Sequence, residues 1–334
     1  MEIPRRVRFP SALASGALVL ALTGCSLFGD ASEPGPSPSP SPEEASPAGG
    51  AAAGFVRPED PYAGVDAELS ERLHLPVYDY RLDVYEEYVV NRAVSTLIVE
   101  CLVDLGYEAS VNSDTRMDLL RMRAFGPQRE YRRYGNTRID IAEEHGFGLP
   151  AEDRGDPAYR IGGDADLRAQ AETAVSGGEE GAETPSGEPV PEGGCMTRAR
   201  RQIDPDSSMP FETTENGAPA DVPTSHGLAD DLLMESFFAA MEDPGVIAAT
   251  AAWEECMAGR VDGYHGTPMS GEGAAGETAV PSVECKGSSG YLDAFVGAER
   301  DILDGLVAEH EEALTERRDR LRENLETSLE ILGW

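Results

Sequence analysis

The chain has 334 residues, and its 62 acidic residues outnumber its 27 lysines and arginines to give a formal net charge of −35. Non-specific nucleic-acid binding relies on cationic side chains that displace counterions from the phosphates, so no nucleic-acid partner is expected. About 280 residues follow Phe55, which is enough for one sizeable domain or two small ones.

Residues 1–24 are predicted to be a signal peptide. Three arginines precede the apolar run Ser11–Thr23, which has the length of a signal-peptide core and is too short to span a bilayer. The run ends in Leu22-Thr23-Gly24-Cys25, which resembles the lipobox of bacterial lipoproteins. We therefore expect a lipid on Cys25 to anchor the protein to the extracytoplasmic face of the cell membrane. An ordinary signal peptide followed by a chance cysteine is the alternative.

Residues 25–54 are predicted to form a disordered linker. They are rich in Pro, Ser, Ala and Gly, and they include the alternation Pro36–Pro42. Such a composition cannot bury enough apolar surface to offset the entropy of ordering. If extended, the linker reaches about 90 Å.

The rest, residues 55–334, is predicted to be mainly α, a disulfide-stapled helical domain with long acidic Gly/Pro-rich loops. It could comprise two Cys-paired halves, about 55–203 and 226–334. Apolar periodicity and capping residues indicate the helices. Expected in chain order are Leu82–Leu105, short helices within Asp114–Gly146 with Thr137 as one N-cap, Asp164–Val175, Cys195–Gln202, Leu228–Met241, a helix capped by Asp243-Pro244, and Tyr291–Leu332.

Four cysteines remain after Cys25, and an even number in an oxidising compartment favours two bridges. A weak internal repeat suggests how they pair: Glu100-Cys101 leads to Gly106-Tyr107, and Glu255-Cys256 leads to Gly263-Tyr264. Each repeat has one later cysteine. This arrangement favours Cys101 with Cys195 and Cys256 with Cys285 among three possible connectivities. Trp253, one turn from Cys256, is expected to be buried against that bridge.

The segment 116–138 opposes the charge of the chain, with seven arginines against two acidic residues. One interpretation is a docking site for an anionic partner, because arginine clusters bind carboxylate and phosphate groups in bidentate fashion. The alternative is that these arginines neutralise carboxylates of their own domain. The candidate patch consists of Arg121, Arg123, Arg129, Arg132 and Arg133.

No catalytic motif is recognisable, and no catalytic residue, metal site or cofactor is predicted. Gly-x-Ser-x-Gly is absent, and His310-Glu311 lacks the second histidine of a zinc protease. A calcium-like spacing begins at Asp204 but has Met209 where the loop needs glycine. Two function classes remain: a non-enzymatic envelope lipoprotein that binds an envelope protein or polymer, or an extracytoplasmic hydrolase with a carboxylate-based site.

Several short blocks resemble a group of uncharacterised actinobacterial lipoproteins, over most of the chain after Phe55. They are Glu100-Cys101 with Gly106-Tyr107, Arg133-Tyr134-Gly135, His145–Pro150, Gly193-Gly194-Cys195, Trp253–Met257 and Val283-Glu284-Cys285. The resemblance implies a helical extracytoplasmic domain with paired cysteines and no established activity.

Overall fold

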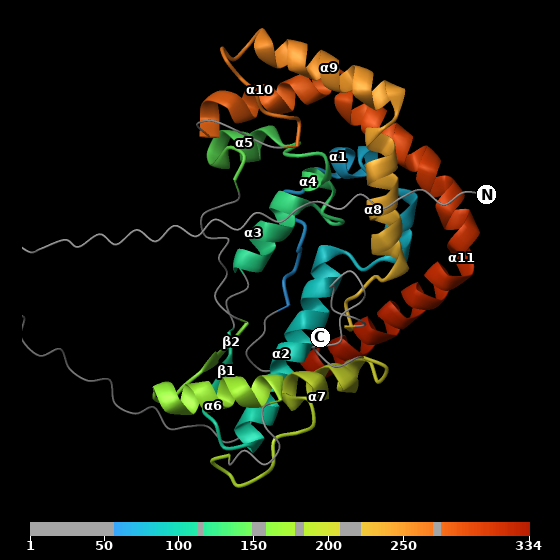
Figure 1. The fold of residues 1–334 in the computed structure, drawn as a ribbon. Coiled ribbons are helices and arrows are strands. Elements are labelled where there is room, and N and C mark those ends of the chain that lie inside the picture. The colour runs from blue at the N-terminus through green and yellow to red at the C-terminus, as the bar shows by residue number, and fades with distance from the viewer. Residues whose placement is uncertain (1–56, 113–115, 149–157, 178–183, 208–221, 270–274) are drawn as a thin grey trace, which may run out of the picture. The chain divides into compact units, whose positions relative to one another are not determined.

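The computed structural model describes residues 57–112, 116–148, 158–177, 184–207, 222–269 and 275–334, and Figure 1 shows their fold. These residues belong to one compact unit, Pro47–Trp334. The expected mainly α architecture is confirmed. The predictions for the signal peptide, Cys25 and the linker lie outside the described residues, as do much of the two acidic loops.

Helix α2, Val84–Asp104, is the central helix predicted from its apolar periodicity. Asp83 and Glu86 form a capping box at its start: the Asp83 side chain accepts from the Glu86 N–H at 2.8 Å, and the Glu86 side chain accepts from the Asp83 N–H at 2.9 Å. Gly106 follows with φ +85°, and a Cβ there would lie 2.8 Å from the backbone nitrogen of Ser186. Glycine is therefore required where α2 ends.

One hydrophobic cluster surrounds α2. It includes residues of α6, Ala165–Ser176, and α7, Gly194–Ile203. The Cys101–Cys195 disulfide joins α2 to α7, which confirms the first predicted bridge. An antiparallel pair of short strands, β1 Ala109–Val111 and β2 Tyr159–Ile161, packs beside this cluster.

A second hydrophobic cluster lies around α8, Leu228–Met241, and α9, Pro244–Ala258. Asp243 caps α9 as expected, accepting from the N–H of Gly245 at 2.7 Å. The 3₁₀ helix η2, Pro76–Tyr80, the short helix α1, Ala67–Arg72, and α4, Glu130–Arg133, lie on this side of the fold.

Helix α11, Tyr291–Leu332, begins and ends at the predicted residues and serves both clusters. Its first turns contribute Tyr291 and Phe295 to the second cluster, and its last turns contribute Leu321 and Leu332 to the first. Helix α11 follows the loop between α7 and α8 in the sequence, yet it packs in both cores. Each cluster therefore contains residues from before and after that loop.

Helix α10, Ala275–Ser288, was not predicted, because Pro281 and the glycine-rich start of this segment are typical of a loop. It packs against α5, Ile139–His145, and α9. The predicted Cys256–Cys285 bridge joins it to α9, and Trp253 is fully buried beside that bridge, donating to the carbonyl of Ser282 at 3.1 Å. These tertiary contacts override a weak local propensity.

The predicted N-cap Thr137 is wrong. Its hydroxyl instead donates to the carbonyl of Tyr131 at 2.9 Å, and Arg138 occupies the position before α5. Thr137 is buried, so its hydroxyl serves the loop between α4 and α5 rather than the helix terminus. The remaining helix of this region is α3, Arg116–Phe125.

Candidate functional site

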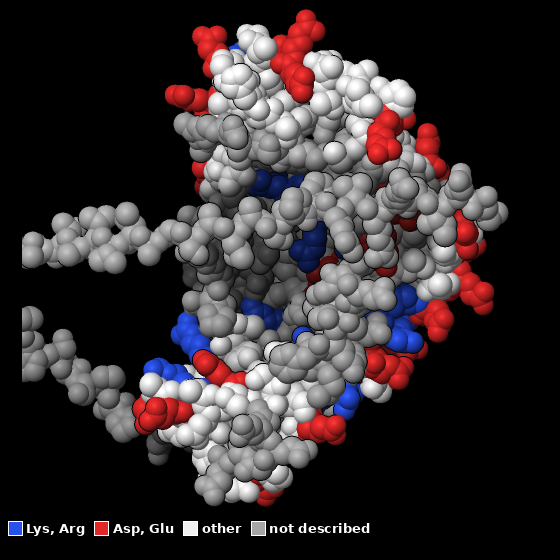
Figure 2. Space-filling view, in the orientation of Figure 1, with Lys and Arg blue, Asp and Glu red and all other residues white. Residues whose placement is uncertain are grey.

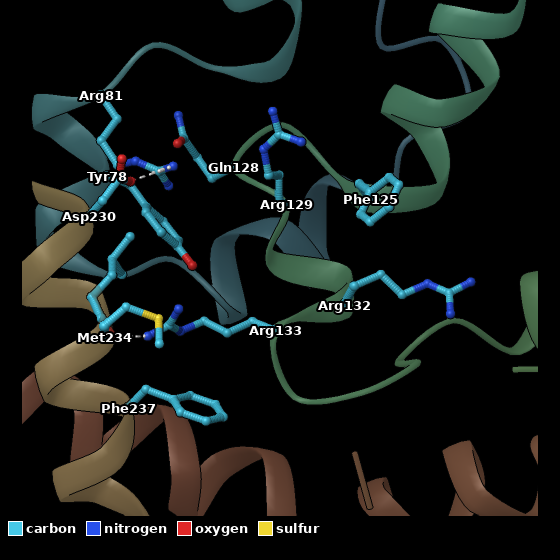
Figure 3. A pocket seen from close by; sticks show the side chains of 11 residues that line it. Tyr78, Arg81, Phe125, Gln128, Arg129, Arg132, Arg133, Asp230, Met234 and Phe237 are labelled. Atoms are coloured by element: carbon cyan, nitrogen blue, oxygen red, sulfur yellow. Dashed lines mark hydrogen bonds and ion pairs between the residues drawn. The ribbon is translucent and has the colours of Figure 1, made fainter. Parts of the chain in front are cut away.

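A cavity of about 510 Å³ lies between η2, the α3–α4 connection and α8, and Figure 3 shows its lining side chains. This volume is within the range of small-molecule sites, roughly 300–1,000 Å³. Arginines and aromatic or apolar side chains dominate the lining, which comprises Tyr78, Arg81, Phe125, Gln128, Arg129, Arg132, Arg133, Asp230, Leu233, Met234 and Phe237.

The backbone of the α3–α4 connection is shaped by a close approach. Gly126 has φ +83°, and a Cβ at this position would lie 2.6 Å from the carboxylate of Glu130. The Glu130 carboxylate accepts from the N–H of Gln128 at 2.7 Å. Arg129 follows in the left-handed region with φ 63°, a conformation that costs a non-glycine residue on the order of 1–2 kcal/mol. This connection thereby brings Gln128 and Arg129 to the rim of the cavity.

Arg81 and Asp230 form one wall. The Arg81 guanidinium lies 3.1 Å from an Asp230 carboxylate oxygen and 3.2 Å from Nδ1 of the buried His226. Burial alone would raise the pKa of Asp230, but the hydrogen bond from His226 and the positive charge of Arg81 lower it below its usual value. Asp230 is therefore an anion that holds Arg81 in place.

A second ion pair at the cavity joins the lining residue Arg133 to Glu299. The Glu299 side chain, on α11, is fully buried; it accepts from Nε of Arg133 at 2.9 Å and from the hydroxyl of Ser236 at 3.0 Å. Arg133 also donates to the carbonyl of Leu233 and lies over the ring of Phe237 at 5.2 Å. Burial alone would lower the pKa of Arg133, but the hydrogen bond to Glu299 raises it. Arg133 is therefore a cation that Glu299 holds in place.

The five residues of the predicted arginine patch do not share one free surface. Arg133 pairs with Glu299 and Arg129 with Glu87, so both follow the alternative in which arginines neutralise carboxylates of their own chain. Arg132 extends away from α8 and donates to the carbonyls of Phe147 and Gly148 at 2.9 and 2.6 Å.

Arg123 and Arg121 complete the predicted set. Arg123 is half-buried, and its carbonyl accepts from Arg138 at 3.0 Å. The side chain of Arg121 lies outside the described residues. What the patch contributes to the cavity is thus Arg129, Arg132 and Arg133, and Figure 3 shows Arg133 running toward Met234 while Arg132 runs the opposite way.

Some buried polar atoms of the lining have no hydrogen-bond partner among the described residues, and they include Nε of Arg81 and Oε1 of Gln128. Native structures leave few such atoms without a partner, and each calls for an explanation. One is a donor on a cation and the other is an acceptor. An anionic oxygen of a ligand would satisfy the donor, and an X–H group of the ligand or of a bridging water would satisfy the acceptor.

Arginines and carboxylates lie side by side around the cavity. Three of the four lining arginines, Arg81, Arg129 and Arg133, pair with the carboxylates of Asp230, Glu87 and Glu299. Figure 2 shows basic side chains set back in the middle of this face, near α4, while acidic side chains project around the upper and right margins. In a chain of net charge −35, these recessed arginines are the groups that attract an anion, whereas the acidic surroundings repel it.

A neighbouring cavity of about 450 Å³ shares Tyr78 and Gln128 with the first and contains Glu130. Its Glu130 carboxylate accepts from the hydroxyl of Ser70 at 2.7 Å. Burial raises the pKa of Glu130, and the hydrogen bonds from Ser70 and from the Gln128 N–H offset only part of that rise. The other carboxylate that lines this cavity is that of Glu71, on α1.

No family model, curated protein or solved structure matches this chain. Among the residues that the structure describes, no helix has the length and apolar character to cross a membrane, and no group of three or more His, Cys, Asp or Glu side chains is arranged to hold a metal ion.

Sequence analysis did not identify several residues that line this cavity. Tyr78, Arg81, Asp230 and Phe237 lie outside the segment 116–138 and come from η2 and α8. Only the aromatic and charged character of each position was visible in the sequence. Their convergence depends on the packing of α8 and η2 against α11.

Proposed function

We propose that this chain is a lipid-anchored, extracytoplasmic binding protein without enzymatic activity, and that its α4–α8 cavity binds an anionic group attached to an aromatic or apolar body. The anchor and location rest on the lipobox Leu22–Cys25. The observation that carries the binding function is the pair of unpartnered polar atoms, Arg81 Nε and Gln128 Oε1, in a cavity lined by arginines and aromatic rings.

The lining suits such a ligand in both of its parts. Arginine binds carboxylate and phosphate groups strongly because its N–H groups form a planar fork. The rings of Tyr78, Phe125 and Phe237 and the side chains of Leu233 and Met234 offer apolar surface beside it. The ligand is either a small molecule or a terminal group of an envelope polymer.

The alternative, a carboxylate-based hydrolase, needs two convergent carboxyl groups of contrasting pKa. Glu130 has a raised pKa, but the second carboxylate in its cavity is Glu71, which lies on α1 among exposed residues. The binding function is therefore the better supported one.

A calorimetric titration tests the proposal with four related probes: benzoate, phenyl phosphate, benzyl alcohol and benzylammonium. The two anions are expected to bind and the neutral and cationic compounds are not. Arg81→Gln removes a charge-assisted hydrogen bond worth about 1.5–3 kcal/mol, so it should weaken binding of the anions by roughly ten- to a hundredfold.

Arg168→Gln is the matched control, because Arg168 is exposed on α6, which does not line the cavity. It should leave the affinity unchanged. Equal binding of benzoate and benzyl alcohol, or equal losses in Arg81→Gln and Arg168→Gln, would contradict the proposal.

A further inference from the structure

Helix α8 exposes three large apolar side chains on one face. Met234 is 52 % exposed, Phe238 59 % and Met241 46 %. Their spacing of four and three residues places them on one stripe of the helix. Ile247, at the start of α9, is 56 % exposed. Single exposed apolar residues are ordinary, but a contiguous set of this size marks an interaction surface.

The stripe continues into an apolar groove of about 440 Å³ beside α9. Met241 and Ile247 both line this groove, so the stripe and the groove form one surface. Tyr291 and Phe295 of α11 contribute to its lining, together with Pro268 and Met269. We call the stripe and the groove together the α8–α9 surface.

The two helices that form most of this surface, α8 and α9, have charged side chains of one sign only. From Leu228 to Gly259 the chain has seven acidic residues and no lysine, arginine or histidine. Asp231 and Glu242 lie one turn before Met234 and one turn after Phe238, and both are exposed. Glu254 lines the groove. Figure 2 shows the outer surface of α9 as white and red.

We propose that the α8–α9 surface docks a cationic amphipathic helix of a partner protein. Apolar side chains of such a helix at three- and four-residue spacing would enter the groove and cover the stripe, and its lysines or arginines would face Asp231, Glu242 and Glu254. The exposed methionines favour this occupant, because flexible thioether side chains adapt to a helix laid across them.

The same charge argues against two other occupants. A second copy of this chain would bring two acidic rims together, and like charges in an interface are unfavourable. An anionic membrane surface would be repelled for the same reason. Both become outcomes that the test must detect.

The test uses the purified protein with Cys25→Ser and a labelled synthetic peptide of about four helical turns, with leucines on one face and lysines on the other. A peptide of the same composition in scrambled order keeps the charge but lacks the apolar face. Fluorescence anisotropy should give an affinity at least about tenfold higher for the amphipathic peptide than for the scrambled one.

The double variant Phe238→Ser/Met241→Ser should lose that tenfold preference. Both side chains are exposed, so the fold should survive, as circular dichroism would check. Met234 stays unchanged because it also lines the α4–α8 cavity. The matched control is Val103→Ser/Leu167→Ser, two exposed apolar residues on α2 and α6, which should bind like the parent protein.

Three results would overturn the proposal. The first is equal binding of the amphipathic and scrambled peptides, which would mean attraction by charge alone. The second is a dimer, measured by light scattering, that the Phe238→Ser/Met241→Ser variant abolishes. The third is flotation with anionic vesicles that depends on the same two residues.

Discussion

Lys286 provides a stability test that depends on one group, because it is the only lysine of the chain. Its side chain on α10 is fully buried, and its Nζ donates to the carbonyl of Asn136 at 2.7 Å. Burial, together with the positive charge of Arg132, lowers the pKa of Lys286 from 10.5 to about 7. The amine therefore loses its proton far more easily in the folded chain than in the unfolded chain.

The sign of the pH dependence follows from proton counting. Between pH 7 and pH 10.5 the unfolded chain holds a proton on Lys286 that the folded chain has released, so the free energy of unfolding rises with pH. The slope approaches about 1.4 kcal/mol per pH unit, which amounts to about 2.5 kcal/mol between pH 7.5 and 9.5.

Urea denaturation of the Cys25→Ser protein at half-unit pH steps measures this slope. The parent protein should gain about 2.5 kcal/mol over the window, whereas Lys286→Met should show an almost flat profile because no lysine remains to titrate. Buried tyrosines such as Tyr78 have raised pKa values and weaken the fold only as pH approaches 10. If the free energy of unfolding changed with pH in parallel for the parent and Lys286→Met, Lys286 would not be the cause of the pH dependence.

The remaining predictions concern the anchor, a buried ion pair and a close backbone approach. Cys25→Ala should release the protein from the membrane fraction or leave it unprocessed; a variant that is processed and still sediments with membranes would disprove lipid anchoring. Glu299→Ala should destabilise the fold by about 3–5 kcal/mol, because it leaves Arg133 charged and buried, and an unchanged urea midpoint would contradict this. Gly135→Ala should cost several kcal/mol more than Gly187→Ala: both glycines have positive φ, but only the Cβ at position 135 would lie 2.2 Å from a carbonyl oxygen, that of Pro268. Equal melting temperatures for the two variants would show that the loop relaxes.

Local sequence signals were sufficient for much of the fold. The apolar periodicity of α2, the Asp243-Pro244 start of α9 and the apolar stripe of α11 are short-range patterns, and each predicted its helix. The internal repeat around Cys101 and Cys256 also led to the observed disulfide pairs.

Features decided by tertiary packing were missed. α10 contains Pro281, and its contacts with α5, α9 and the Cys256–Cys285 bridge stabilise it. Its own sequence therefore does not predict a helix. Thr137 was predicted to be an N-cap, but its hydroxyl donates to the carbonyl of Tyr131 across the loop. The sequence of α10 is typical of a loop, and the sequence around Thr137 is typical of a helix start. In both places long-range contacts determine the structure that forms.

The candidate site shows the same division. The cluster of arginines in 116–138 drew attention to the segment from which Arg129, Arg132 and Arg133 line the cavity. Their pairing with carboxylates on other helices, such as Arg133 with Glu299 on α11, joins positions 166 residues apart. No local sequence pattern predicts such a pair. Arg81 lines the cavity only because η2 packs against α8 and α11.

A crystal structure of the Cys25→Ser protein with 4-bromobenzoate tests directly whether the α4–α8 cavity binds an anionic aromatic group. The anomalous signal of bromine locates the ligand without prior assumptions. We expect a bromine peak among Tyr78, Phe125 and Phe237, with the carboxylate within hydrogen-bond distance of the Arg81 guanidinium. A bromine peak elsewhere on the protein, with the cavity holding only water, would contradict it.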